Sequence, residues 1–394
     1  MTLIREVRPG VEWVGAIDWD RRLFDALIPL PSGTSYNSYL VRGSERIALI
    51  DAVDTSMADV LLGNLEALGI QSLDYIVCQH AEQDHSGAIK RLLEVYPEAS
   101  VLGTDRCLEL LVEFGIARRE RMREVKDGET IHLGGRALQF IHAPWVHWPD
   151  TMLTYLPEER ILFTCDFLGS HLATSDLYAD EATFYGPAKR YYSEIMMPFR
   201  QRIKGHLERI GSLKIDAVAP SHGPLYSRPS LILDAYRDWV SDDVRNQVVL
   251  PYVSMHGSTE AMADHLTDAL IARGISVRRF DLTCYDLGEL AEALVDAATV
   301  VIGSPTMLAG AHPRALYAAV LANALRPKAR FASVIGSFGW GGRMVEQITS
   351  ALSGLKVEVL RPVVARGRPK QADLQALEGL AEEILERHRG IGIA

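Results

Sequence analysis

The sequence predicts two domains of different design: an α+β sheet sandwich covered by helices over residues 1–246, and an α/β doubly wound parallel sheet over residues 247–394. The chain has 394 residues, and at roughly 150 residues per domain this length suggests two or three domains. Up to about residue 225, short apolar runs alternate with turns, whereas strands and helices alternate regularly from residue 247. Hydrophobic residues make up 48% and charged residues 23% of the chain, which excludes a disordered or fibrous protein.

The first half is predicted to contain short strands with helices between them. Apolar runs bounded by turn residues indicate strands at 11–17, 35–41, 46–53, 73–80 and 137–144, and a hairpin at 152–166 that turns at Pro157 and Glu158. Helices are expected near 56–68, 86–96 and 105–115. Strands before and after helices favour a sheet sandwich with helices on its outside.

The second half is predicted to alternate strictly between strand and helix. We expect strands at 247–253, 276–282, 298–303, 330–336 and 355–361, and helices at 259–273, 287–296, 313–325, 342–353 and 371–388. This alternation is typical of a doubly wound, five-stranded parallel sheet. A segment of helical periodicity at 228–246 is expected to carry the chain across the domain boundary.

Charge and cysteine content narrow the class of protein. The 41 basic and 51 acidic residues give a net charge of -10, which argues against a nucleic-acid-binding surface. Four cysteines without a Cys-x-x-Cys pair exclude a disulfide framework and a thiolate metal site. Glu6 and Arg8 interrupt the N-terminus where a signal peptide would be apolar, and the longest uncharged stretch, 297–313, contains glycine and proline. We therefore expect a soluble cytoplasmic protein without a membrane span.

Side chains that ligate metals follow several of the predicted strands. Four occur within six residues at the end of the strand at 73–80: His80, Glu82, Asp84 and His85. On an extended segment the first three would share one side, and the fourth would begin the next helix. Burying this much charge without a cation would be costly. Three further candidates follow later strands: His147, Asp166 and His222. Seven such groups suffice for two metal ions that share one bridging carboxylate.

The order and spacing of these residues resemble the metal domain of flavodiiron proteins, a metallo-β-lactamase-like αββα sandwich. The motif His-x-Glu-x-Asp-His is followed by His, Asp and His at separations of 62, 19 and 56 residues. Most proteins of the wider fold are zinc hydrolases with His-x-His-x-Asp-His, and a harder oxygen ligand at Glu82 favours iron. The resemblance implies one iron on His80, Glu82 and His147, a second on Asp84, His85 and His222, and Asp166 as the bridge. It also implies substrate-pocket residues at Phe24, Trp148 and Tyr192.

The loop 254–262 resembles the phosphate loop of flavodoxins. It places hydroxyl residues and a glycine directly before a helix, where backbone N–H groups are free to bind a phosphate. The third and fourth strands of this half end in glycine-containing loops, where flavodoxin-like folds hold an isoalloxazine ring. The absence of a G-x-G-x-x-G pattern followed by an acidic residue disfavours NAD, and we expect FMN. The predicted FMN-binding residues are Ser254, Met255, His256, Gly257, Ser258, Thr259, Ser304, Pro305, Thr306, Met307, Leu308, Ala309, Gly310, Ser337, Phe338, Gly339, Trp340, Gly341 and Gly342.

The resemblance covers essentially the whole chain and implies a reductase. FMN would receive electrons from an external donor and pass them to a diiron centre that reduces O2 to water or NO to N2O. Because the chain stops at Ala394 without a rubredoxin or flavin-reductase module, the expected donor is a separate rubredoxin or similar carrier. Members of this family form head-to-tail dimers, so we expect a homodimer or a dimer of dimers.

Two other functions remain open at this stage. The first is a binuclear zinc hydrolase with an accessory flavodoxin-like domain, against which Glu82 and the flavin loops weigh. The second is a flavin electron carrier or sensor with a vestigial metal domain, against which the complete set of seven ligand residues weighs.

Overall fold

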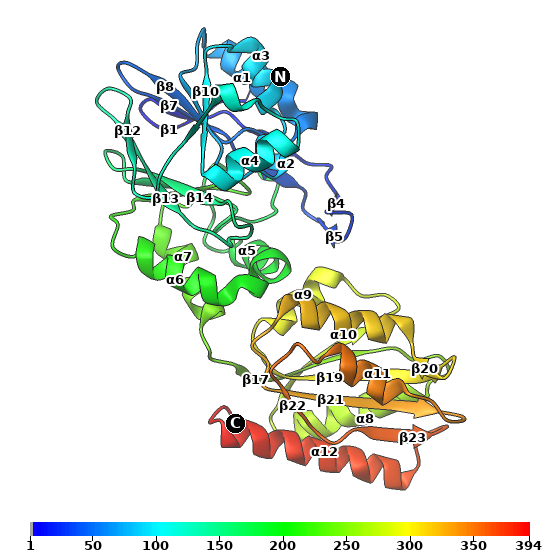
Figure 1. Cartoon of the computed structure of the whole chain (residues 1–394). Coiled ribbons are helices and arrows are strands. Elements are labelled where there is room, and N and C mark those ends of the chain that lie inside the picture. Colours follow the sequence, from blue (N-terminus) through cyan, green and yellow to red (C-terminus); the bar gives the residue numbers. More distant parts are fainter. Residues whose placement is uncertain (1–2) are drawn as a thin grey trace. The chain divides into compact units, whose positions relative to one another are not determined.

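The computed structural model describes residues 3–394, and the chain divides into two compact units (Figure 1). The first unit contains the chain up to Tyr192 together with Phe199–Val240, and the second contains Ser193–Pro198 and Ser241–Ala394. No helix among the described residues is long and apolar enough to cross a membrane.

The first unit is built on two sheets. The larger sheet has the order β1 (Arg5–Arg8), β2 (Val11–Trp13), β7 (Tyr39–Arg42), β8 (Ile47–Ile50), β9 (Tyr75–Val77), β10 (Ser100–Gly103), β11 (Met122–Glu124). The smaller sheet has the order β12 (Thr130–His132), β13 (Ala137–His142), β14 (Met152–Leu156), β15 (Ile161–Cys165), β16 (Ala217–Pro220). Two small antiparallel pairs accompany them: β3 (Ala16–Asp18) with β6 (Thr34–Tyr36), and β4 (Leu23–Phe24) with β5 (Ile28–Pro29).

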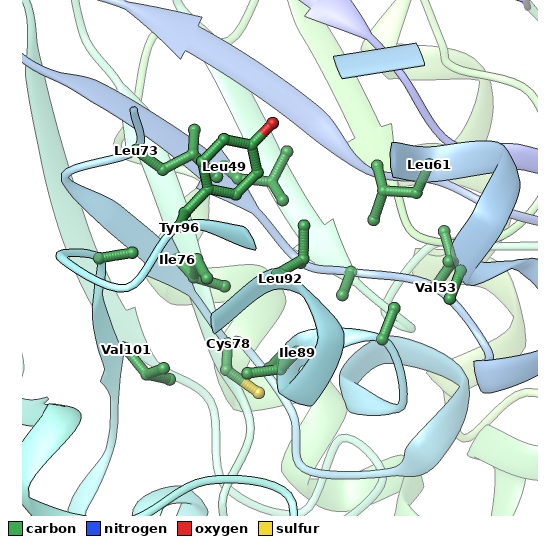
Figure 2. Close-up of a cluster of buried hydrophobic side chains, with 14 of the residues drawn as sticks. Leu49, Val53, Leu61, Leu73, Ile76, Cys78, Ile89, Leu92, Tyr96 and Val101 are labelled. Carbon is green, nitrogen blue, oxygen red and sulfur yellow. The ribbon is translucent and has the colours of Figure 1, made fainter. Parts of the chain in front are cut away.

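Apolar side chains fill both sides of the larger sheet. One core joins the two sheets and includes Trp13, Val77 and Phe163. The other core lies between the larger sheet and its helices, α1 (Ala58–Ala67), α3 (Ile89–Val95) and α4 (Asp105–Glu113). Figure 2 shows part of it, where Leu92 from α3 lies near Ile76 from β9 and Leu61 from α1 lies near Val53. Each such fully buried side chain contributes about 2 kcal/mol to folding.

Further helices complete the first unit. They are α2 (Gln83–Ser86), α5 (Tyr185–Tyr191), α6 (Arg200–Ile210) and α7 (Pro229–Val240). The predicted helices and hairpin of this half are present, and the sandwich with outer helices is confirmed.

Two predicted strands are broken in the structure, at residues 11–17 and 35–41. Each run splits between two sheets, because β2 pairs with β7 whereas β3 pairs with β6. A Cβ atom on Gly15 would lie 2.2 Å from the carbonyl oxygen of Tyr36, so this close crossing requires glycine. At the second break the Asn37 amide group donates to the carbonyls of Pro220 and Gly223. The break therefore ties the β6–β7 connection to the loop that carries His222.

The second unit is a parallel sheet with helices on both faces. Its strand order is β18 (Ser276–Asp281), β17 (Arg245–Tyr252), β19 (Ala297–Met307), β21 (Phe331–Phe338), followed by β22 (Glu358–Val359) and β23 (Val363–Arg366). This is the 2-1-3-4-5 order of flavodoxin-like folds. On one face lie α8 (Ser258–Ala272) and α12 (Gln371–Gly390), and on the other α9 (Leu287–Leu294), α10 (Pro313–Leu325) and α11 (Met344–Ala351).

The fifth strand differs from the prediction of 355–361. It is split into β22 and β23 on either side of Pro362, and both pieces run parallel to β21. Proline has no N–H to donate to the ladder, so pairing stops there and resumes at Val363. The third strand also extends to Met307 and forms a short antiparallel pair with β20 (Gly310–Ala311).

Candidate metal and flavin sites

The seven predicted metal ligands come from the ends of neighbouring strands in the first unit. His80 and Glu82 lie in the loop after β9, Asp84 and His85 in α2, His147 between β13 and β14, Asp166 directly after β15, and His222 after β16. The expectation that Asp84 continues an extended segment was wrong, since α2 begins at Gln83. This early helical turn separates the motif into two pairs of side chains.

The first group joins His80, Glu82, His147 and Asp166. The Nε2 atoms of His80 and His147 each lie 3.1 Å from Glu82 Oε2. They lie 3.7 and 3.8 Å, respectively, from Asp166 Oδ2. One nitrogen from each histidine and one oxygen from each carboxylate therefore converge within 4.8 Å of one another, a donor set that could hold a metal ion.

The second group joins Asp84, His85 and His222, and it uses the other oxygen of Asp166. Asp166 Oδ1 lies 3.0 Å from His85 Nε2 and 3.3 Å from His222 Nε2. The same two nitrogens lie 3.4 and 3.1 Å from the oxygens of Asp84. The two oxygens of one buried carboxylate thus face two separate groups of ligand atoms.

Unsatisfied oxygens show that these groups fit metal ions. Both oxygens of Asp84 and Oδ2 of Asp166 are buried and accept no hydrogen bond from any described residue. Buried carboxylate oxygens without donors are costly, and imidazole nitrogens lie close to them without hydrogen-bond geometry. Oxygen and nitrogen lone pairs that point to a shared centre are the arrangement that a cation requires.

Residues behind the ligands orient them. His80 Nδ1 lies 3.1 Å from Asp150 Oδ2, which also accepts from the backbone N–H of Ala81 at 2.8 Å. His222 Nδ1 lies 2.7 Å from the carbonyl oxygen of Ser35, which can only accept. Both contacts put the hydrogen on Nδ1 and leave Nε2 free as a ligand. Asp150 is a functional residue that the sequence analysis missed, although it follows His147 by only three positions.

The electrostatics of the groups favour positive charge at the ligand nitrogens. Burial would lower the pKa of His222, but its contacts with Asp166 and Asp84 raise that pKa to about 10. Burial acts in the opposite sense on Asp166, where His85 and His222 hold the carboxyl pKa well below its usual range. The carboxylates therefore stay ionised and attract either protons or metal cations at the Nε2 positions.

The predicted pocket aromatics have different positions. The Trp148 ring lies 4.8 Å from that of His80, and Phe24 lies 5.0 Å from the ring of His171. Tyr192 is not brought to the cluster, because its hydroxyl donates to the carbonyl of Trp239. Its neighbour Tyr191 takes that place, and its hydroxyl donates to Asp166 Oδ1 at 2.9 Å. The sequence could not distinguish two adjacent tyrosines, since the choice depends on the rotation of α5.

The predicted phosphate loop leads directly into α8. Gly257 precedes the helix with φ of +79°, and no described side chain caps the first N–H groups of α8. In α4 and α9, by contrast, a side chain makes this cap. Free N–H groups at the N-terminus of a 15-residue helix fit a phosphate. The Thr259 hydroxyl is buried and lies 3.1 Å from Ser337 Oγ, so it links the phosphate loop to a ring loop.

The two predicted ring loops follow β19 and β21, at the same end of the sheet. Leu308 is 91% exposed and Trp340 is 78% exposed, so both are available to cover a planar ring. A cavity of about 220 Å³ lies between these loops and the start of α11. It is lined by Thr306, Phe338, Gly341, Gly342, Arg343, Met344, Val345, Glu346 and Val364. The predicted flavin residues therefore gather at one end of the sheet, where a flavin could bind.

Comparison with known proteins identifies both domains. A model of the ODP family of β-lactamases matches residues 34–223, and a flavodoxin model matches residues 250–379. The chain is 35% identical to a nitric oxide reductase of Moorella thermoacetica over 97% of this chain and 98% of the relative.

Two solved structures are similar to this chain over nearly its whole length. Rubredoxin oxygen:oxidoreductase from Desulfovibrio gigas superposes with a TM-score of 0.94 at 27% identity, over 98% of this chain and 99% of that chain. The flavodiiron protein of Giardia intestinalis gives a TM-score of 0.92 at 28% identity, over 99% and 98% of the two chains.

Fold and site together define a two-domain oxidoreductase, with a metallo-β-lactamase-like domain followed by a flavodoxin-like domain. The chain belongs to the flavodiiron protein family, the A-type flavoproteins.

Proposed function

We propose that this chain uses FMN and two iron ions to reduce O2 to water, NO to N2O, or both, with electrons from a rubredoxin-like donor. The observation that carries the proposal is the position of Asp166, whose two oxygens face two histidine-containing groups. The names of its relatives support both substrates, since one is a nitric oxide reductase and another a rubredoxin oxygen:oxidoreductase.

The residues of the first unit would hold the irons and shield them. When bound, FMN stores two electrons and the irons one each, which matches the four electrons needed to reduce O2. His80, Glu82 and His147 would hold one iron, and Asp84, His85 and His222 the other. Asp166 would bridge them, and the Tyr191 hydroxyl fixes the orientation of that carboxylate. The Trp148 ring packs edge-on against His80 and would help to shield the iron that His80 holds.

Iron is favoured over zinc by the chemistry of the donor set. Glu82 supplies a hard oxygen where hydrolases of this fold use a histidine, and oxygen ligands suit a metal that cycles between two oxidation states. A hydrolase would also have no use for the uncapped helix and the exposed ring loops of the second unit.

The same proposal includes a cytoplasmic location and a head-to-tail homodimer. All four cysteines are free, and Cys78 and Cys107 remain unbonded although their sulfur atoms lie 3.6 Å apart. A chain with few cysteines and no disulfide is typical of a reducing compartment. The dimer is supported by the family resemblance.

Turnover of the purified protein tests the proposal. The iron- and FMN-loaded chain, supplied with reduced rubredoxin, should consume O2, NO or both, and Asp166→Ala should abolish this activity while FMN stays bound. The proposal would be refuted if the protein as purified contained zinc instead of iron and the iron-loaded protein consumed neither gas.

A further inference from the structure

His171 lies beside the metal-binding groups, although the sequence analysis did not select it. Its ring centroid lies 5.0 Å from that of Phe24, 4.8 Å from that of Tyr191 and 5.0 Å from that of His222. Two of these neighbours belong to the site, because His222 is a predicted ligand and Tyr191 donates to Asp166. The imidazole of His171 therefore borders the second group of ligands.

One nitrogen of this imidazole is unsatisfied. The Nε2 atom of His171 is buried and has no hydrogen-bond partner in residues 3–394. An unpaired polar atom in the interior destabilises the fold. A buried nitrogen of this kind next to a reactive site points to a ligand that the protein binds there.

The hydrogen bonds of Thr34 determine which kind of ligand fits. The Thr34 hydroxyl oxygen lies 3.0 Å from His171 Nδ1 and 3.4 Å from the carbonyl oxygen of Ser35. That carbonyl already accepts a short hydrogen bond from His222 Nδ1. A separation of 3.4 Å is long for an O–H···O hydrogen bond, so the Thr34 hydroxyl donates to His171 Nδ1 at 3.0 Å, which leaves the hydrogen on Nε2. The unsatisfied atom is thus a donor, and it needs an acceptor.

We propose that the Nε2–H group of His171 donates a hydrogen bond to a small acceptor molecule bound at the second group of metal ligands. The inference rests on the proposed function and adds a substrate-binding residue to it. Three rings have their centroids within 5.0 Å of that of His171, so a molecule of a few atoms fits better than a bulky one. Molecules with an exposed oxygen or nitrogen lone pair, such as O2, NO, hydroxide or azide, belong to this class.

Azide binding to the iron-loaded protein tests the inference without turnover. His171→Phe keeps a ring of similar size and removes the donor, so azide should bind about tenfold more weakly. Thr34→Val removes the hydroxyl that places the hydrogen on Nε2 and should weaken azide binding in the same direction. Thr34→Ser keeps the hydroxyl and is the matched control, with azide affinity within about twofold of the wild type. Infrared spectra of bound azide should show a shifted antisymmetric stretch for His171→Phe and Thr34→Val only.

Iron content, measured for every variant, separates the outcomes. Equal azide affinity and an equal stretch in wild type, His171→Phe and Thr34→Val would overturn the inference and leave the proposed function intact. Loss of iron from His171→Phe, together with unchanged azide binding by Thr34→Val, would also overturn it, since His171 would then only support His222. If the wild-type chain takes up no iron at all, the proposed function fails and this inference fails with it.

Discussion

At the scale of single residues, the metal ligands depend on partners that hold their outer nitrogens. Asp150 is fully buried and contacts His80 Nδ1 with both oxygens, at 3.1 and 3.2 Å. Burial would raise the pKa of this carboxyl, but His80 and the N–H of Ala81 lower it below its ordinary value. An ionised carboxylate at this place raises the basicity of the ligand and fixes its tautomer.

Replacing this carboxylate should weaken iron binding without removing a ligand. We expect Asp150→Asn to lower iron affinity by about 10- to 100-fold, because His80 loses its charged partner. Flavin content should not change. Iron titration against a competing chelator measures the effect, and Asp20→Asn is the control because its side chain is 99% exposed. Equal affinities in the two variants would show that Asp150 does not support the ligand.

The ligand residues could be predicted from sequence, whereas their partners could not. Seven side chains at the ends of strands are visible as a spaced pattern, since strand ends meet at one edge of a sheet. His171 and Tyr191 depend on ring packing that no spacing reveals. Asp84 lies in a helical turn and not on an extended segment, because α2 begins at Gln83, two residues after Ala81.

A histidine in the second unit makes stability depend on pH. His388 is buried, and burial lowers its pKa to about 4. The unfolded chain takes up this proton near pH 6.5 and the folded chain only near pH 4, so the unfolded state binds more protons between these values. The neutral histidine therefore stabilises the fold above about pH 6.5, and that contribution is lost as pH falls to about 4.

The His388→Gln variant should flatten this dependence. In the wild type the free energy of unfolding should fall by up to about 1.4 kcal/mol per pH unit from this residue alone. Urea unfolding, monitored by the release of flavin at about pH 5 and about pH 7, measures how the free energy of unfolding changes with pH in both proteins. The same slope in the variant and the wild type would mean that other groups cause the acid sensitivity.

At the scale of secondary-structure elements, the start of α8 carries the flavin prediction. Glycines flank this helix at both ends in the left-handed conformation, Gly257 with φ of +79° and Gly274 with φ of +73°. Nothing lies within 4 Å of a Cβ atom built on either residue. An alanine at either position would therefore be strained to a similar extent, and the two positions differ in their distance from the phosphate loop.

A pair of alanine variants uses this similarity. Both Gly257→Ala and Gly274→Ala should lower the free energy of unfolding by about 1 kcal/mol, because alanine disfavours positive φ. Only Gly257→Ala should weaken FMN binding, since its methyl group enters the space at the uncapped N–H groups. Flavin fluorescence during dilution measures the dissociation constant of each variant. Equal FMN affinity in both would place the phosphate elsewhere.

The elements of the second unit followed the sequence more closely than those of the first. Strict alternation of strand and helix predicted the parallel sheet; the third strand runs on to Met307, and the fifth was misplaced because Pro362 divides it. In the first unit the strand break at Gly15 depends on a close approach to the backbone of Tyr36. Because Tyr36 is distant in the sequence, no local pattern predicts this break.

At the scale of the whole molecule, the two cofactor sites belong to different units. All seven metal-ligating residues lie in the first unit, and all predicted FMN-binding residues lie in the second. In a head-to-tail homodimer each flavin would serve the irons of the partner subunit across a two-fold interface.

Complementation between two inactive variants tests this arrangement. One carries His80→Ala and Asp166→Ala, and the other has Ser258 and Thr259 replaced by bulky apolar residues. Each homodimer should be inactive, whereas mixed dimers should regain about half of the wild-type rate of O2 consumption per dimer, because one of two composite sites is intact. Mixed dimers that form and stay inactive would mean that electrons travel within one chain.

The central claim is that flavin and two irons act together in a single reductase, and one anaerobic measurement tests it directly. The fully reduced protein, without donor, is mixed with one equivalent of O2 per chain in a stopped-flow instrument while flavin absorbance and hydrogen peroxide are followed. Four stored electrons per chain predict that each chain consumes one O2, oxidises its flavin and irons together, and releases water without peroxide. Peroxide formed in proportion to oxidised flavin, with the same yield in Asp166→Ala, would contradict the account.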